Sequence, residues 1–149
     1  ANDLRLARAI VRIGRELERA GDEAKKIARF ALSLDKANEG DPVLAVARQL
    51  RHMSALSGSM LRNAVRAADE MDLELARSVL ERDAELDAEF AAALRLVMSY
   101  VLQDHRFLRP TIDTIFALKG LERIGDHAAN IAEQVLYMMG QERREADAA

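Results

Sequence analysis

The sequence contains no cysteine and no tryptophan, and only 4% of its residues are aromatic. Without cysteine there is no disulfide bond and no thiolate metal site, a composition that fits the reducing cytoplasm. The shortage of aromatic rings argues against a stacking platform for single-stranded nucleic acid. A net charge of −3 gives no general attraction for nucleic acid either. We therefore expect a cytoplasmic protein that does not bind nucleic acid.

Proline and glycine are also rare, with 2 and 7 occurrences among 149 residues. Half of the residues are hydrophobic and 32% are charged, a mixture typical of an all-α protein. No apolar run approaches the ~18 residues needed to span a bilayer, so we expect no membrane span. The sequence also lacks a Ser-His-Asp or Cys-His set and a glycine-rich phosphate loop, so we do not expect an enzyme.

Apolar periodicity predicts four long helices. Asp41 and Pro42 are typical of a helix start, and Gly140 is typical of a helix end. Short connections make neighbouring helices antiparallel, so the expected fold is an elongated all-α bundle. The predicted helices cover about residues 3–34, 42–68, 72–103 and 110–140, followed by a polar tail at 141–149.

The first predicted helix carries a nine-position apolar seam with spacings of four and three. The seam consists of Leu6, Ile10, Ile13, Leu17, Ala20, Ala24, Ile27, Ala31 and Leu34. An exposed stripe of this length is unusual for a monomer, so we predict a homo-oligomer, in the simplest case a homodimer. Five arginines make the outer face of this helix basic, which serves either solubility or docking to an acidic partner: Arg5, Arg8, Arg12, Arg15 and Arg19.

An internal repeat links the first and last helices. When the sequence is shifted by 104 positions, residues 4–32 align with residues 108–136, and 11 of the 29 aligned pairs are identical. Two predicted helices precede the second copy, but only a short stretch of chain precedes the first. The sequence therefore indicates either a truncated first repeat or a protein built from four helices.

Acidic residues interrupt two of the apolar seams. Asp83 and Asp87 stand where the third predicted helix should place core residues, and Glu122 and Asp126 interrupt a seam of the fourth. If the turn between these helices is centred between Asp104 and His105, residues whose numbers add to 209 lie at equal height. Asp83 then faces Asp126, and Asp87 faces Glu122.

Four facing carboxylates predict a site for hard or borderline metal ions, because buried carboxylates need compensation. Gly125 would leave room at this level, and His127 is a further candidate ligand. The alternative is an ordinary salt-bridged face, with Arg82, Lys119 and Arg123 neutralising the acids. A ferritin-like di-metal enzyme is disfavoured, because no histidine follows a glutamate by three positions.

Three stretches resemble the PhoU family of phosphate-signalling regulators. "LERIGDHAANIAEQVLYMMG" is similar to the closing helix of that family, "ELERAGDEAKKIARFAL" to its first-repeat counterpart, and "VLERDAELDAEF" to its D-x-x-x-D helix. The resemblance implies two tandem three-helix repeats. Residues 1–34 would be the last helix of a first repeat that lacks its first two helices, and residues 41–140 a complete second repeat.

The resemblance also implies a function and a ligand set. The chain would be a cytoplasmic negative regulator of phosphate transport and phosphate-starvation signalling, acting on a phosphate ABC transporter and a sensor histidine kinase. Its metal would be iron or zinc, or else manganese, in a multinuclear site. The implied ligands are Glu18 and Asp22 in the first repeat, with Asp83, Asp87, Glu122 and Asp126 in the second. The alternatives are a PhoU-like regulatory segment of a phosphate or ion transporter, and a metal-free helical interaction module.

Overall fold

The computed structural model describes residues 2–33 and 41–140, and these residues form helices and short connections without a strand. The all-α prediction is confirmed. Leu34 and the tail 141–149 lie outside the described residues. The elements are α1 (Asn2–Ser33), α2 (Pro42–Ala45), α3 (Ala47–Glu70), α4 (Leu73–Gln103), the 3₁₀ turn η2 (His105–Phe107) and α5 (Leu108–Met138).

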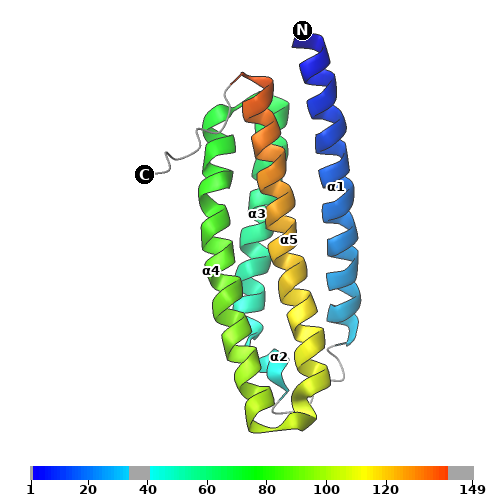
Figure 1. Cartoon of the computed structure of the whole chain (residues 1–149), viewed down its shortest axis with the longest axis vertical. Coiled ribbons are helices and arrows are strands. Elements are labelled where there is room, and N and C mark those ends of the chain that lie inside the picture. Colours follow the sequence, from blue (N-terminus) through cyan, green and yellow to red (C-terminus); the bar gives the residue numbers. More distant parts are fainter. Residues whose placement is uncertain (1, 34–40, 141–149) are drawn as a thin grey trace.

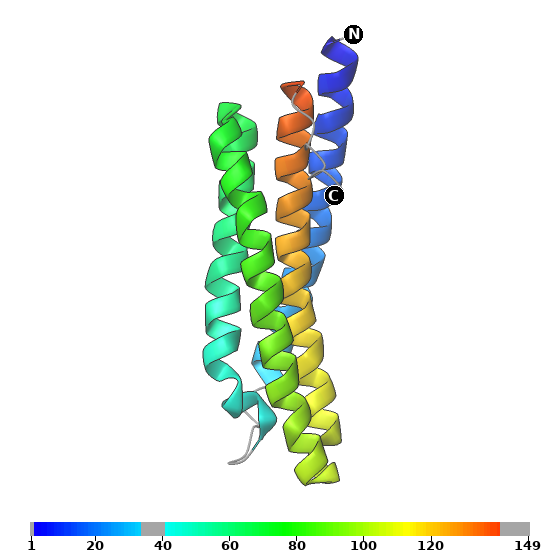
Figure 2. The same ribbon diagram turned by 60° about the vertical axis from the view of Figure 1, so that its left-hand side comes forward.

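The long helices run side by side in an elongated bundle (Figure 1). Helices α3, α4 and α5 pack around one another, whereas α1 lies along α5 on the side away from α3 and α4 (Figure 2). Helix α5 therefore contacts every other long helix. This confirms the predicted elongated bundle and gives α5 two different interfaces.

Local sequence signals explain the starts of α2 and α4. Asp41 caps α2 by accepting a hydrogen bond from the Val43 amide at 3.1 Å, and Pro42 occupies the first turn. Asp72 caps α4 by accepting from the Leu75 amide at 3.0 Å. The predicted single helix over 42–68 is wrong in one respect. The helix breaks at Val46, whose φ of −102° and ψ of 10° leave α-helical geometry, and it restarts at Ala47.

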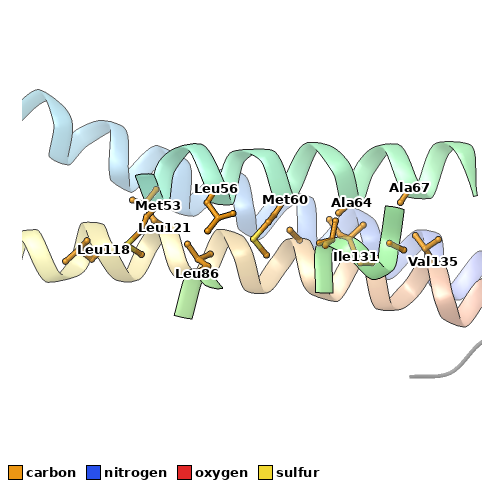
Figure 3. Packing of buried hydrophobic residues seen from close by; sticks show 14 of the residues in the cluster. Met53, Leu56, Met60, Ala64, Ala67, Leu86, Leu118, Leu121, Ile131 and Val135 are labelled. Carbon is orange, nitrogen blue, oxygen red and sulfur yellow. The ribbon is translucent and has the colours of Figure 1, made fainter. Parts of the chain in front are cut away.

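The apolar core lies between α3, α4 and α5. Methionine, leucine and alanine side chains of α3 point toward Leu118, Leu121, Ile131 and Val135 of α5, and Leu86 enters from α4 (Figure 3). These α5 and α4 side chains are at most 4% exposed. Burial of a large apolar side chain contributes about 1.5–3 kcal/mol, so this core supplies the main driving force for the three-helix unit.

The predicted core seam of α4 is wrong by one helical face. The four-three spacing predicts a core line of Ala76, Leu80, Phe90, Leu94, Val97 and Val101. The buried positions are instead Ala76, Val79, Leu86, Ala93 and Val97, so only Ala76 and Val97 were predicted correctly. Helix α4 is turned so that Leu86, rather than an aspartate, faces α5. Asp83 is consequently half-buried and Asp87 exposed, at the edge of the α4–α5 interface rather than in the core. That edge keeps the carboxylates partly hydrated, which avoids the large cost of burying them.

The predicted seam of α1 is only partly correct, because one side of it is turned away from α5. Leu6, Ile10 and Leu17 are 44%, 58% and 38% exposed. Three residues of the predicted seam do face α5, namely Ile13, Ala20 and Ile27. They share this face with Ala9, Glu16 and Glu23, and the six positions also follow spacings of four and three. The exposed apolar stripe is compatible with the predicted oligomer, which stays a prediction. The two glutamates on the face toward α5 form ion pairs across the interface.

Helices α1 and α5 are antiparallel and related by the internal repeat. Glu16 contacts Asn130 and Glu23 contacts Arg123, so partners have residue numbers that add to 146. Gly21 and Gly125 satisfy both relations, because their numbers differ by 104 and also add to 146. The two repeat copies therefore cross with an approximate local two-fold axis near these glycines.

Candidate metal centre

Three of the four predicted carboxylates come together at the edge of α4 and α5. Asp83, Asp87 and Asp126 each offer an oxygen, and these oxygens all lie within 4.8 Å of one another. Asp83 and Asp87 come from successive turns of α4, and Asp126 faces them from α5. The antiparallel hairpin thus brings Asp83 opposite Asp126, as the sequence register predicts.

The environment of Asp126 shows that this cluster is electrostatically unfavourable without a cation. Burial raises the pKa of the Asp126 carboxyl, and the neighbouring charges of Glu122, Asp83 and Asp87 raise it further. Lys119 acts in the opposite direction but does not cancel these effects. A bound cation would compensate the same charges and favour the ionised form.

Glu122 takes a different partner from the one predicted. Its Oε2 lies 2.6 Å from Lys119 Nζ, one turn earlier on α5, and the Glu122 side chain is 13% exposed. The ammonium also lies 5.2 Å from the ring centroid of Phe90 on α4. Glu122 therefore remains within electrostatic range of Asp126 without joining the group of three aspartates.

The space at Gly125 is already filled, contrary to the expectation of room for a ligand. A Cβ atom at this position would lie 2.1 Å from Leu86 Cδ2. Glycine is required here because Leu86, which is fully buried, packs directly against the α5 backbone. Leu86 lies between Asp83 and Asp87 in sequence, so this contact positions the α4 face that carries both aspartates.

The first-repeat pair is not assembled into a comparable site. Glu18 and Asp22 lie on the exposed side of α1. Within residues 2–33 and 41–140, no third histidine, aspartate or glutamate gathers with them into a metal-binding group. Their repeat partners Glu122 and Asp126 differ because α4 packs beside them.

His127 lies at the other interface of α5, away from the aspartate cluster. Its Nδ1 is 2.7 Å from Glu16 Oε2, and both side chains are largely buried. The Asn130 amide donates to the same carboxylate oxygen at 3.0 Å. Burial alone would raise the pKa of Glu16, but the hydrogen bonds with Asn130 and His127 hold it below its usual value. His127 thus joins α5 to α1, which does not support its candidacy as a metal ligand.

Comparison with known proteins identifies the family. The PhoU domain family matches residues 50–135. The chain belongs to the PhoU family. A phosphate-specific transport system accessory protein PhoU homologue of Xylella fastidiosa (strain Temecula1) is 38% identical over 143 residues, which are 96% of this chain and 58% of that protein. The homologue of Pseudomonas putida is 41% identical over 139 residues, 93% of this chain and 53% of its own length.

Two solved PhoU structures share the fold. The crystal structure of PhoU from Pseudomonas aeruginosa superposes with a TM-score of 0.84 at 39% identity, covering 94% of this chain and 66% of that one. The phosphate transport system regulatory protein PhoU from Streptococcus pneumoniae gives a TM-score of 0.81 at 27% identity, covering 95% and 65%. The chain thus spans little more than half the length of the curated relatives it matches.

No helix within residues 2–33 and 41–140 combines the length and the apolar character that a bilayer crossing requires.

The three aspartates could close around a small divalent ion. Opposite oxygens on a small divalent ion are about 4.4 Å apart for bonds of about 2.2 Å. Small side-chain movements would therefore be enough to bring the aspartate oxygens, which lie within 4.8 Å of one another, onto such an ion. A donor set of carboxylates alone favours a hard ion such as manganese over zinc, which prefers nitrogen or sulfur ligands.

The prediction from sequence missed three residues that join α1 to α5: Glu16, Glu23 and Asn130. Glu23 is 6% exposed and pairs with Lys26 at 2.9 Å and Arg123 at 3.7 Å. A signal was present, because Glu16, Ala20, Glu23 and Ile27 follow the same four-three spacing as an apolar seam. Because two positions on that line are glutamates, the line does not look like an apolar packing face in the sequence.

Proposed function

We propose that this chain is a regulatory component of a phosphate transport system, acting on the cytoplasmic side of the membrane as a negative regulator of phosphate-starvation signalling. The observation that carries the proposal is the 38–41% identity to phosphate-specific transport accessory proteins over 93–96% of this chain. Its partners would be a phosphate ABC transporter and a sensor histidine kinase. Its role would be binding rather than catalysis.

A replacement experiment tests this role. In a Pseudomonas putida strain, the matching segment of the PhoU homologue is replaced by this chain, and a phosphate-starvation reporter is measured in phosphate-rich medium. We expect the reporter to stay low, as in wild type. A hybrid protein that accumulates normally but leaves the reporter as high as in a deletion strain would contradict the proposal. A coding sequence that carries membrane spans beside this chain would instead favour a regulatory segment of a transporter.

We further propose that Asp83, Asp87 and Asp126 hold a divalent metal ion, with Glu122 close enough to contribute when Lys119 is displaced. The proposal is supported by the convergence of the three aspartates and by the raised pKa of Asp126. Manganese or ferrous iron suits the donor set better than zinc. Bound metal would stiffen the α4–α5 edge by joining side chains from both helices, and a second ion would be needed for a multinuclear site.

Thermal melting in EDTA, and then with Mn²⁺, Fe²⁺ or Zn²⁺, tests the metal site. A metal that binds only the folded chain stabilises it by about 2.7 kcal/mol at 100 times its dissociation constant. The double substitution Asp83→Asn and Asp126→Asn should abolish this shift. The matched control is Glu18→Gln with Asp22→Asn, the exposed repeat-related pair, which should preserve it.

Two outcomes of the melting experiment are decisive. Equal metal-dependent shifts in wild type and in the aspartate double variant would refute the site. An absence of any shift would favour the competing function, a helical interaction module that binds no metal. The phosphate-regulation proposal is tested separately by the reporter, so failure of the metal site leaves that result interpretable.

A further inference from the structure

A cavity of about 340 Å³ lies in the groove between α1 and α5, on the side of α5 that does not carry the aspartate cluster. Three arginines of α1 line it: Arg12, Arg15 and Arg19. Their spacing of three and four places them on one face of the helix. Asn130 and Gln134 line the opposite wall on α5 and bring amide donors.

Two of these arginines carry a charge that no other group neutralises. In the part of the chain that the structure describes, neither Arg12 nor Arg15 forms an ion pair. Arg19 lies 3.6 Å from Glu16 Oε1. Both unpaired guanidinium groups are on exposed residues, so they remain available to a ligand from solution.

The acidic residues in the groove do not outweigh the arginines. Glu16 already interacts with His127, Asn130 and Arg19, so its charge is balanced locally. Glu133 adds one negative charge to the lining. Three guanidinium groups against two carboxylates leave the groove with a net positive charge.

The internal repeat supplies a contrasting groove on the same interface. A second cavity, of about 610 Å³, is lined by Lys119 and Arg123, the repeat counterparts of Arg15 and Arg19. There Lys119 and Arg123 are already paired, since Lys119 lies 2.6 Å from Glu122 and Arg123 lies 3.7 Å from Glu23. Arg29 also lines this cavity and forms no ion pair within the described residues. Phe116 replaces the third arginine at the position equivalent to Arg12. The first groove therefore brings two unpaired guanidinium groups together, whereas the second cavity has a single one, that of Arg29.

We propose that the groove formed by Arg12, Arg15 and Arg19 of α1 with Asn130 and Gln134 of α5 binds a small phosphate-bearing anion. A guanidinium forms paired hydrogen bonds with phosphate oxygens, and a phosphate group has enough oxygens to accept from several arginines at once. A carboxylate has only two oxygens and can therefore accept hydrogen bonds from fewer arginines. The cavity volume lies at the lower end of the range for small-molecule sites, which suits a compact ligand better than a peptide.

Isothermal titration of the purified chain tests the proposal, with EDTA present so that phosphate bound to a metal ion is excluded. The probes are inorganic phosphate and ADP at constant ionic strength, which distinguish a free phosphate from a nucleotide. We expect saturable binding of at least one probe. Loss of one charge-assisted contact should weaken it about tenfold in Arg15→Gln and again in the double variant with Arg12→Gln.

The matched control is Arg29→Gln, which removes the same charge from the same helix but lies in the repeat-related cavity. Arg29→Gln should change the affinity by less than about twofold, because an exposed charge in the other cavity is separated from the first groove and screened by salt. Equal weakening by Arg15→Gln and Arg29→Gln would mean general electrostatic attraction and would overturn the proposal. So would the absence of saturable binding of both probes up to about 10 mM, weaker than any useful affinity. The inference does not rest on the proposed regulatory role, and the reporter experiment is independent of it.

Discussion

Substitution of Gly125 by alanine tests the packing that sets the α4–α5 interface. The added methyl group would lie 2.1 Å from Leu86 Cδ2 and 3.6 Å from Met60 Cε. Favourable carbon–carbon contacts are about 3.5–4.0 Å long, so Leu86 must change its rotamer or the helices must separate. Overpacking of this severity costs about 2–3 kcal/mol, whereas the higher helix propensity of alanine returns about 1 kcal/mol. We expect a net loss of about 1–2 kcal/mol.

The assay is urea unfolding followed by far-ultraviolet circular dichroism at pH 7 in EDTA, with thermal melting in parallel. The expected loss corresponds to a fall in Tm of about 2–8 °C for a protein of this size. Gly21→Ala is the matched control, because Gly21 is the repeat counterpart of Gly125 and a Cβ there has no neighbour within 4 Å. That variant should be stabilised by about 1 kcal/mol through helix propensity alone.

A double substitution identifies the atom responsible. In the Leu86→Ala background the clash is absent, so Gly125→Ala should become neutral or stabilising by about 1 kcal/mol. Additive effects of the two substitutions would refute the reasoning. The same holds if Gly125→Ala stabilises the wild-type chain as much as Gly21→Ala does.

Three further predictions concern charge and assembly. In EDTA, Asp126→Asn should raise the unfolding free energy at pH 7, because the raised pKa of Asp126 makes its ionised form unfavourable in the fold. In urea unfolding this difference should vanish as the pH falls below the ordinary value of 3.8. Glu16→Gln should act in the opposite direction and lower the unfolding free energy at pH 7. The pKa of Glu16 in the fold lies below its ordinary value of 4.5, so its ionised form stabilises the fold above that pH. The difference between the variant and the wild type should disappear in acid. Light scattering at micromolar concentration should show an oligomer that Ile10→Lys dissociates, because Ile10 lies on the exposed apolar stripe; a wild-type monomer would contradict this.

The helices could be predicted from sequence because their signals are local. Asp41, Pro42 and Asp72 act on the residues beside them, and the fold follows from apolar spacing and short turns. The convergence of Asp83 and Asp126 was also predictable, since an antiparallel hairpin fixes which residues share a height. The prediction needed only the position of the turn, which is at Asp104 to Phe107.

The rotation of each helix could not be predicted, because two adjacent lines of residues both followed the four-three spacing. On α4 the line through Leu86 is buried, and the choice depends on the absence of a side chain at Gly125, 39 positions later. On α1 the line through Glu16 and Glu23 is buried because His127 and Arg123 of α5 pair with them. Such choices depend on contacts between distant segments, which the pattern within one helix does not contain.

Because α1 is attached along only one side of α5, the free energy of local opening should be lower for α1 than for the other three long helices. Helices α3, α4 and α5 share one apolar core, so their innermost amides exchange with solvent only when that core opens. Helix α1 can separate by losing its alanine and isoleucine contacts and the pairs made by Glu16 and Glu23. Its amides should therefore exchange through a smaller, local opening, and any ligand that joins Arg15 to Asn130 would slow that exchange while leaving the core amides unchanged.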